Sequence, residues 1–69
     1  MTKEMKLRDV NSALHRQSCH VISDRGDHTK WGCPCGHHSA NILRHTTVTP
    51  GVVRDTIRRL ACLPKGWLQ

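Results

Sequence analysis

The chain has 69 residues, a length that leaves room for one small domain, and we expect a single domain over 1–69. It contains no Phe or Tyr and two Trp, so its core has to be built mainly from aliphatic side chains. The longest apolar run, 60–63, has four residues, whereas a membrane span requires about 20. Composition therefore excludes a transmembrane helix.

The chain is basic, with 11 Lys and Arg against five Asp and Glu and a formal net charge of +6. The excess is uneven along the sequence. Residues 1–27 hold five bases and four acids, a net of +1, and residues 28–69 hold six bases and one acid, a net of +5. A basic segment of this kind favours a polyanionic partner, nucleic acid first. A basic surface that serves only solubility is the alternative.

The first predicted element is a helix over 4–17. Leu7, Val10 and Leu14 recur at the i, i+3 and i+7 positions of one helix face, and Ala13 widens this apolar stripe. Strands are predicted over 19–24, 28–33 and 38–43. Turn-forming residues at 24–27 and 34–36 separate these strands.

The last predicted element is a helix that starts after Thr49. Thr49 suits the N-cap, and Pro50 suits the first helical position, where its missing N–H costs nothing. Asp55 is placed to pair with Arg59 one turn later, and Pro64 is predicted to end the helix. The apolar stripe consists of Val53, Ile57 and Leu60, with Val52, Thr56 and Ala61 beside it.

The order α-β-β-β-α predicts an α+β fold with a three-stranded antiparallel sheet. Two amphipathic helices can cover one face of such a sheet. The other face, or its rim, is then available for a partner. The shared core is expected over about 5–61, and the tail 62–69 receives no role.

Four cysteines, at positions 19, 33, 35 and 62, allow three disulfide pairings. The N-terminus lacks the apolar stretch of a secretion signal, which favours a cytoplasmic location and reduced thiols. Cys33 and Cys35 flank a single proline, too close for an easy mutual bridge. We therefore expect all four cysteines to be reduced.

A zinc site is an alternative for the segment 33–38, which reads Cys-Pro-Cys-Gly-His-His. Structural zinc sites take four thiolate or imidazole ligands, usually from Cys-x₂₋₄-Cys pairs. Here the pair is Cys-x-Cys, and Cys19, His20 or Cys62 would have to complete the site from a distance. A hairpin turn with reduced thiols is the interpretation we prefer.

Histidines mark the candidate catalytic positions. His28 follows a predicted turn at the start of a strand, where it should be exposed, and an imidazole near neutral pH can give or take a proton. His45 follows Arg44 at the end of the third strand. If that strand lies beside the second, Arg44 and His45 approach the Lys30-Trp31 side and form a small basic cluster. Solvated surface residues are the alternative for each.

These residues together resemble the HicA family of toxins, from the HicA–HicB toxin–antitoxin systems of bacteria and archaea. The resemblance rests on a short helix and a strand, followed by three motifs and covering about 5–61. The motifs are Gly26-Asp27-His28-Thr29-Lys30-Trp31, Ile42-Leu43-Arg44-His45 and Thr49-Pro50-Gly51-Val52-Val53-Arg54. It implies a fold like that of a double-stranded RNA-binding domain and a ribosome-independent mRNA interferase.

The resemblance also implies site residues, with His28 as the catalytic histidine. The family segment usually reads Gly-Ser-His, so Asp27 departs from the pattern. The third strand normally ends in Pro-Arg-His, and here Leu43 replaces the proline. Ser18 stands where a glycine commonly precedes the first strand.

The expected activity is slow cleavage of mRNA without a cofactor, because RNA carries its own nucleophile in the 2′-hydroxyl. His28 would act as general base or acid, which usually supplies about 10²–10⁴-fold. Lys30, Arg44 and His45 would bind RNA and stabilise charge on the phosphate. A HicB-like antitoxin protein is the expected second partner and would cover the histidine. The alternatives are a non-catalytic RNA-binding module and a small zinc-dependent interaction protein.

Overall fold

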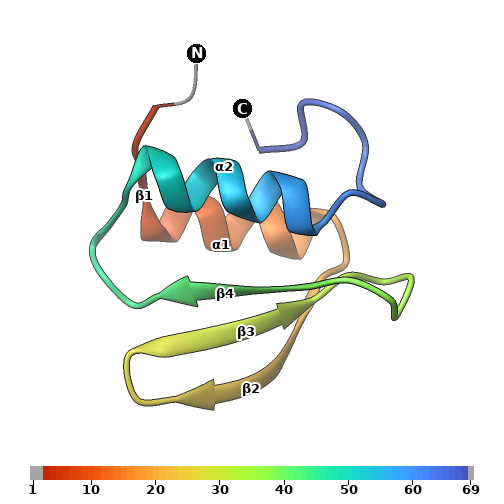
Figure 1. Ribbon diagram of the computed structural model, residues 1–69, viewed down its shortest axis with the longest axis horizontal. Coiled ribbons are helices and arrows are strands. Elements are labelled where there is room, and N and C mark those ends of the chain that lie inside the picture. The colour runs from red at the N-terminus through yellow and green to blue at the C-terminus, as the bar shows by residue number, and fades with distance from the viewer. Residues whose placement is uncertain (1–2, 69) are drawn as a thin grey trace.

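The computed structural model describes residues 3–68 and has an α+β fold (Figure 1). Strands β2, β3 and β4 form an antiparallel sheet in the order β2-β3-β4, and both helices lie on one side of it. The predicted α-β-β-β-α arrangement is confirmed. Neither helix within 3–68 has the length and apolar character needed to cross a membrane. In chain order the elements are β1 (Met5–Lys6), α1 (Leu7–Arg16), β2 (His20–Arg25), β3 (His28–Gly32), β4 (Ser39–Leu43), β5 (Thr47–Val48) and α2 (Pro50–Arg59).

Strand β3 is the centre of the sheet, and its side chains alternate between two environments. Trp31 packs against the helices with 3% of its surface exposed, whereas His28 and Lys30 are exposed. Because successive side chains of a strand point to opposite faces, His28 and Lys30 share the face that the helices do not cover. We call this the open face. Gly26, with φ of +54°, gives the β2–β3 turn its left-handed backbone.

Two short strands, β1 and β5, were not predicted. They pair antiparallel, with Met5 opposite Val48 and Lys6 opposite Thr47, and the Leu7 N–H donates to the Thr46 carbonyl at 2.9 Å. This pairing takes residues 5–6 out of the predicted helix, so α1 begins at Leu7. The partner strand is far away in the sequence, and local periodicity therefore contains no sign of it.

Helix α2 begins as predicted and ends earlier than predicted. The Thr49 side chain accepts a hydrogen bond from the Val52 N–H at 3.4 Å, and Pro50 is the first helical residue. The predicted Asp55–Arg59 ion pair is present at 2.8 Å. The helix ends at Arg59, before Pro64 is reached, so the prediction that Pro64 ends it is wrong.

The core lies between the helices and the sheet and includes the C-terminal tail. Thr56 is 1% exposed and donates its hydroxyl to the Val52 carbonyl at 2.8 Å, which satisfies the buried group. Leu68 is 7% exposed, and the tail therefore completes the core instead of extending past it. The buried apolar residues are Val10, Ala13, Leu14, Cys19, Trp31, Cys33, Ala40, Ile42, Val48, Val53, Leu60 and Leu68.

The turn from α1 to β2 contains a strained residue. Ser18 has φ of 63°, and within 3–68 it is the one non-glycine residue in the left-handed region. A residue just past a helix C-terminus often adopts this conformation, which glycine tolerates best. The position at which the HicA pattern has glycine is thus one whose backbone favours glycine.

Candidate functional site

His28 stands at the first position of β3, next to the two-residue turn Gly26–Asp27. Its register partner on β2 is Arg25, and its partner on β4 is Leu43. Directly opposite residues in an antiparallel pair have Cβ atoms about 4.5–5.5 Å apart and point to the same face. The exposed Arg25 and His28 side chains therefore lie together on the open face.

Lys30 is the second predicted site residue on this face. It lies two positions after His28, about 7 Å further along the strand, and pairs with Ser23 and Asn41. Arg25, His28 and Lys30 form what we call the open-face cluster. Arg25 was missed by sequence reasoning, although it flanks the same two-residue turn as His28, and hairpin pairing across that turn would have placed it opposite the histidine.

Arg44 does not join the open-face cluster. As expected, the third strand lies beside the second, but the register places Arg44 next to Asp27, whose carbonyl accepts its backbone N–H at 2.6 Å. The Arg44 side chain forms an ion pair with Asp24 and donates to the Thr29 hydroxyl at 3.2 Å. Arg44 therefore lies on the Trp31 side of β3, where both residues line one hollow, whereas Lys30 points to the open face, so the expected basic cluster of Arg44 with Lys30 does not form.

The Arg44 side chain belongs to a hollow on the helix side of the sheet. The Thr29 hydroxyl also lies 3.3 Å from an Asp24 carboxylate oxygen, which links the three side chains into one network. The hollow has a volume of about 340 Å³, and Val21 and Asp24 of β2 contribute to its lining. Its lining includes Leu7, Asn11, His15, Trp31 and Ile42. The carboxylate of Asp24 neutralises Arg44 here, so this guanidinium is a positioned structural group.

His45 is exposed and lies beyond the end of β4. Its backbone N–H donates to the Leu43 carbonyl at 2.9 Å, and its side chain lines a small hollow with Val48 and Val52 near the start of α2. It follows Asn41, the register partner of Lys30, by four residues and therefore lies beyond the end of the sheet from Lys30. The predicted cluster of Lys30, Arg44 and His45 does not form as one group.

The groups in the open-face cluster are of the kinds that bind anions and transfer protons. The cluster combines the imidazole of His28 with the planar guanidinium of Arg25 and the compact ammonium of Lys30. Arg8, Arg44 and Arg59 form ion pairs, whereas over residues 3–68 the structure records none for Arg25 or Lys30. Both cations are therefore available to an anionic ligand, which Arg44 is not.

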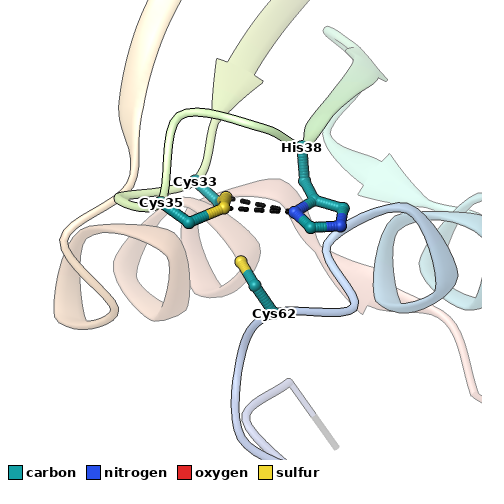
Figure 2. Close-up of side chains that lie close together, drawn as sticks. All are labelled: Cys33, Cys35, His38 and Cys62. Atoms are coloured by element: carbon teal, nitrogen blue, oxygen red, sulfur yellow. Dashed lines mark hydrogen bonds between the residues drawn. A yellow bond between two sulfur atoms is a disulfide. The ribbon is translucent and has the colours of Figure 1, made fainter.

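A second cluster joins cysteines and a histidine at the opposite end of the sheet (Figure 2). Cys33 follows β3, His38 precedes β4, and Cys62 follows α2. The His38 Nδ1 lies 3.7 Å from the Cys33 Sγ and 3.1 Å from the Cys35 Sγ. With Cys62, one ligand atom from each of the four residues lies within 4.8 Å of the others.

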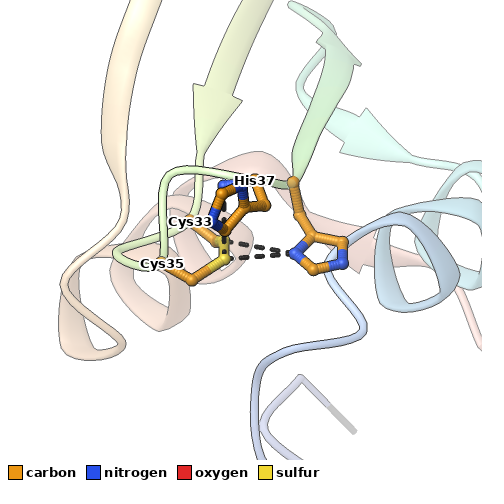
Figure 3. Close-up of a disulfide and its surroundings, with 4 residues drawn as sticks. Cys33, Cys35 and His37 are labelled. Carbon is orange, nitrogen blue, oxygen red and sulfur yellow. Dashed lines mark hydrogen bonds between the residues drawn. A yellow bond between two sulfur atoms is a disulfide. The ribbon is translucent and has the colours of Figure 1, made fainter.

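The structure joins Cys33 and Cys35 by a disulfide (Figure 3). The prediction that both are reduced is therefore wrong for this form of the chain. The turn at 34–37 brings the two sulfurs to the same side, with a Cα–Cα distance of 5.4 Å, which lies inside the range of ordinary disulfides. Cys19 and Cys62 are free thiols, as predicted.

Cys19 lies close to this cluster but outside it. It is 5% exposed, and burial raises the pKa of its thiol above the ordinary value, with the nearby Cys62 thiolate raising it further. The sequence had left Cys19, His20 and Cys62 as possible partners for the Cys33–Cys35 pair. The structure brings Cys62 and His38 to the pair, and not Cys19 or His20.

Comparisons of this chain with protein-family models, with curated proteins and with solved structures found no match.

Proposed function

We propose that this chain is an RNA-cleaving toxin, an endoribonuclease of the HicA type that a HicB-like antitoxin holds silent. One observation carries the proposal: an exposed histidine, His28, shares the open face of the sheet with Arg25 opposite it and Lys30 on the same strand. The surplus of positive charge after residue 27 is consistent with RNA as the partner.

The chemistry follows from the groups in the open-face cluster. His28 takes the proton of a ribose 2′-hydroxyl, whose oxygen then attacks the adjacent phosphorus. The bond from phosphorus to the 5′-oxygen breaks, the leaving oxygen takes a proton from water, and the products are a 2′,3′-cyclic phosphate and a 5′-hydroxyl. Arg25 and Lys30 stabilise the negative charge that develops on the phosphate oxygens.

The fold supports the resemblance at two points. The α-β-β-β-α order is the one that the HicA family implies. Ser18, at the position of the family's glycine, has the left-handed backbone that favours glycine. Both observations concern architecture, and neither depends on the proposed activity.

The proposed antitoxin would cover the open face. Ile22, in the irregular part of β2, is 52% exposed on this face, and its terminal carbon occupies the space that a side chain at Gly32 would fill. An acidic protein with an apolar contact residue fits such a surface. A HicB-like reading frame beside the gene would supply this protein, and co-expressing it with the toxin should restore growth.

The test compares purified wild-type chain with His28→Ala on labelled single-stranded RNA. We expect shortened products from the wild type and a loss of about 10²–10⁴-fold in the variant. His20→Ala is the matched control, because His20 is another exposed histidine at the far end of the same sheet. Cleavage by His28→Ala at the wild-type rate would show that another group performs the reaction.

The same experiment distinguishes a non-catalytic RNA-binding module. Such a module would bind RNA with an affinity that falls as the salt concentration rises. It would yield no shortened products at any protein concentration. Induction of both versions in a bacterial host gives the cellular counterpart. Growth arrest and RNA decay should accompany the wild type, and His28→Ala should remove both.

A further inference from the structure

We propose that the reduced chain holds one structural Zn²⁺ ion, bound by Cys33, Cys35, His38 and Cys62. The cluster lies at the opposite end of β3 from His28, so this site is separate from the open-face cluster. It is independent of the proposed RNA cleavage and can be tested without RNA.

The four ligand atoms lie close enough together to surround one metal ion once the disulfide between Cys33 and Cys35 is reduced. Zn–S bonds of about 2.3 Å and Zn–N bonds of about 2.0 Å at tetrahedral angles place ligand atoms about 3.5–3.8 Å apart. The His38 Nδ1 lies 3.7 Å and 3.1 Å from the two loop sulfurs, and the four atoms lie within 4.8 Å of one another. Reduction frees the Cys33 and Cys35 sulfurs to move apart, and side-chain rotation of the cysteines then allows a tetrahedral arrangement.

The loop between β3 and β4 is folded so that its donors converge. Gly36 has φ of +79°, and the turn is closed by the Gly36 N–H, which donates to the Cys33 carbonyl at 3.0 Å. The Cys33 N–H donates to the His38 carbonyl at 3.0 Å, which holds the two ends of the loop together. The His37 N–H donates to the Cys35 Sγ at 3.4 Å (Figure 3), and such a bond stabilises a thiolate.

The donor set selects zinc and a structural role. Three thiolates and one imidazole form a Cys₃His set, which is a common structural zinc site. Because protein atoms fill all four positions, no position is left for a water molecule or a substrate. Sulfur-rich tetrahedral sites also disfavour the hard cations Mg²⁺ and Ca²⁺.

The ion would connect the C-terminal tail to the sheet. Cys62 belongs to the segment after α2, whereas the other three ligands belong to the β3–β4 connection (Figure 2). The same tail brings Leu68 into the core. A chain of this length buries a small core, and a metal that ties two distant segments together is a common source of additional stability.

The disulfide and the zinc site are two forms of the same cysteines. A dithiol reductant transfers two electrons and two protons to the Cys33–Cys35 bond, giving two thiols, and is itself oxidised to a disulfide. Zn²⁺ then displaces the protons of these two thiols and of the Cys62 thiol. Zinc binding therefore requires reducing conditions and weakens as the pH falls.

The first measurement is the metal content of untagged full-length chain, expressed with zinc and purified under a phosphine reductant. We expect close to one zinc per chain. Replacement by Co²⁺ should give the visible bands of a tetrahedral ion and a thiolate-to-cobalt charge-transfer band in the near ultraviolet. Reduced wild-type chain with neither zinc nor these bands would overturn the proposal.

Two cysteine variants test the ligand assignment. Cys62→Ser should weaken Co²⁺ binding at least tenfold and lower the charge-transfer intensity by about one third, because one of three thiolates is lost. Cys19→Ala is the matched control, since Cys19 lies near Cys62 but outside the four ligands, and it should retain one metal with the wild-type spectrum. An unchanged spectrum in Cys62→Ser, or its loss in Cys19→Ala, would show that the assignment is wrong.

Discussion

Arg25 and Arg44 both lie close to His28 in the fold, but they should contribute differently to the proposed RNA cleavage. Arg25 is the register partner of His28 on the open face. Arg44 points to the helix side, where Asp24 neutralises it and the Thr29 hydroxyl holds it. We therefore predict that Arg25→Ala impairs cleavage strongly and that Arg44→Ala impairs it little, whereas the HicA resemblance alone points to Arg44.

The expected magnitudes follow from these contacts. A hydrogen bond to a charged group contributes about 1.5–3 kcal/mol, so losing the Arg25 contact to the phosphate should slow cleavage about 10- to 150-fold. The Arg44 and Asp24 side chains are 46% and 44% exposed, and solvent screens such a pair. Its loss should cost about 0–1 kcal/mol of folding stability.

The assay uses a short RNA that carries a fluorophore and a quencher, at a concentration well below KM, so that the initial rate reports kcat/KM. Thermal unfolding of both variants serves as the control for folding. An equal loss of kcat/KM in the two variants, with both still folded, would refute the reasoning. It would mean that the Asp24–Arg44 pair opens to bind phosphate.

Four further outcomes are expected. Lys30→Gln should make the negative slope of log K against log salt less steep by about 0.7, where K is the association constant for single-stranded RNA. Fluorescence anisotropy at several KCl concentrations measures this slope, and an unchanged slope would show that Lys30 does not contact RNA. Ser18→Gly should stabilise the fold by about 0.5–1 kcal/mol, because the strain energy that is relieved exceeds the entropic cost of the more flexible unfolded chain. Thermal unfolding measures this, and a lower Tm in the variant would contradict it. Thr49→Ala should lower the stability by about 1 kcal/mol, or a Tm decrease of about 4–8 °C, through loss of the helix cap, and an unaltered Tm would show that the cap contributes little. In the zinc-loaded chain, mass spectrometry should find Cys35 and Cys62 protected from alkylation, and chelation should expose both, while Cys19 and Cys33, which are 5% and 0% exposed, still react slowly. Equal labelling of Cys35 and Cys62 before and after chelation would contradict metal protection.

Local chemistry made much of this fold predictable. Thr49 and Pro50 specify the start of α2 because a cap and a fixed φ act within one turn. The turn before His28 and the alternation along β3 place that histidine on an exposed face, since both effects involve neighbouring residues. These signals need no knowledge of distant segments.

Tertiary structure decided the features that join distant segments. The pairing of β1 with β5 shortened the first helix, and the register of β4 turned Arg44 away from the open face and towards Asp24. Cys62 reaches the β3–β4 loop because α2 packs across the sheet, so the Cys-x-Cys pair and the nearby His38 gain a fourth possible ligand from a distant segment. By itself the sequence determined the two helices, the three strands of the main sheet and the exposed histidine, because those depend on contacts within a few residues. Strand register decided which cation lies beside that histidine, and helix packing decided which thiol completes the cysteine cluster. Both bring together residues that are far apart in the sequence.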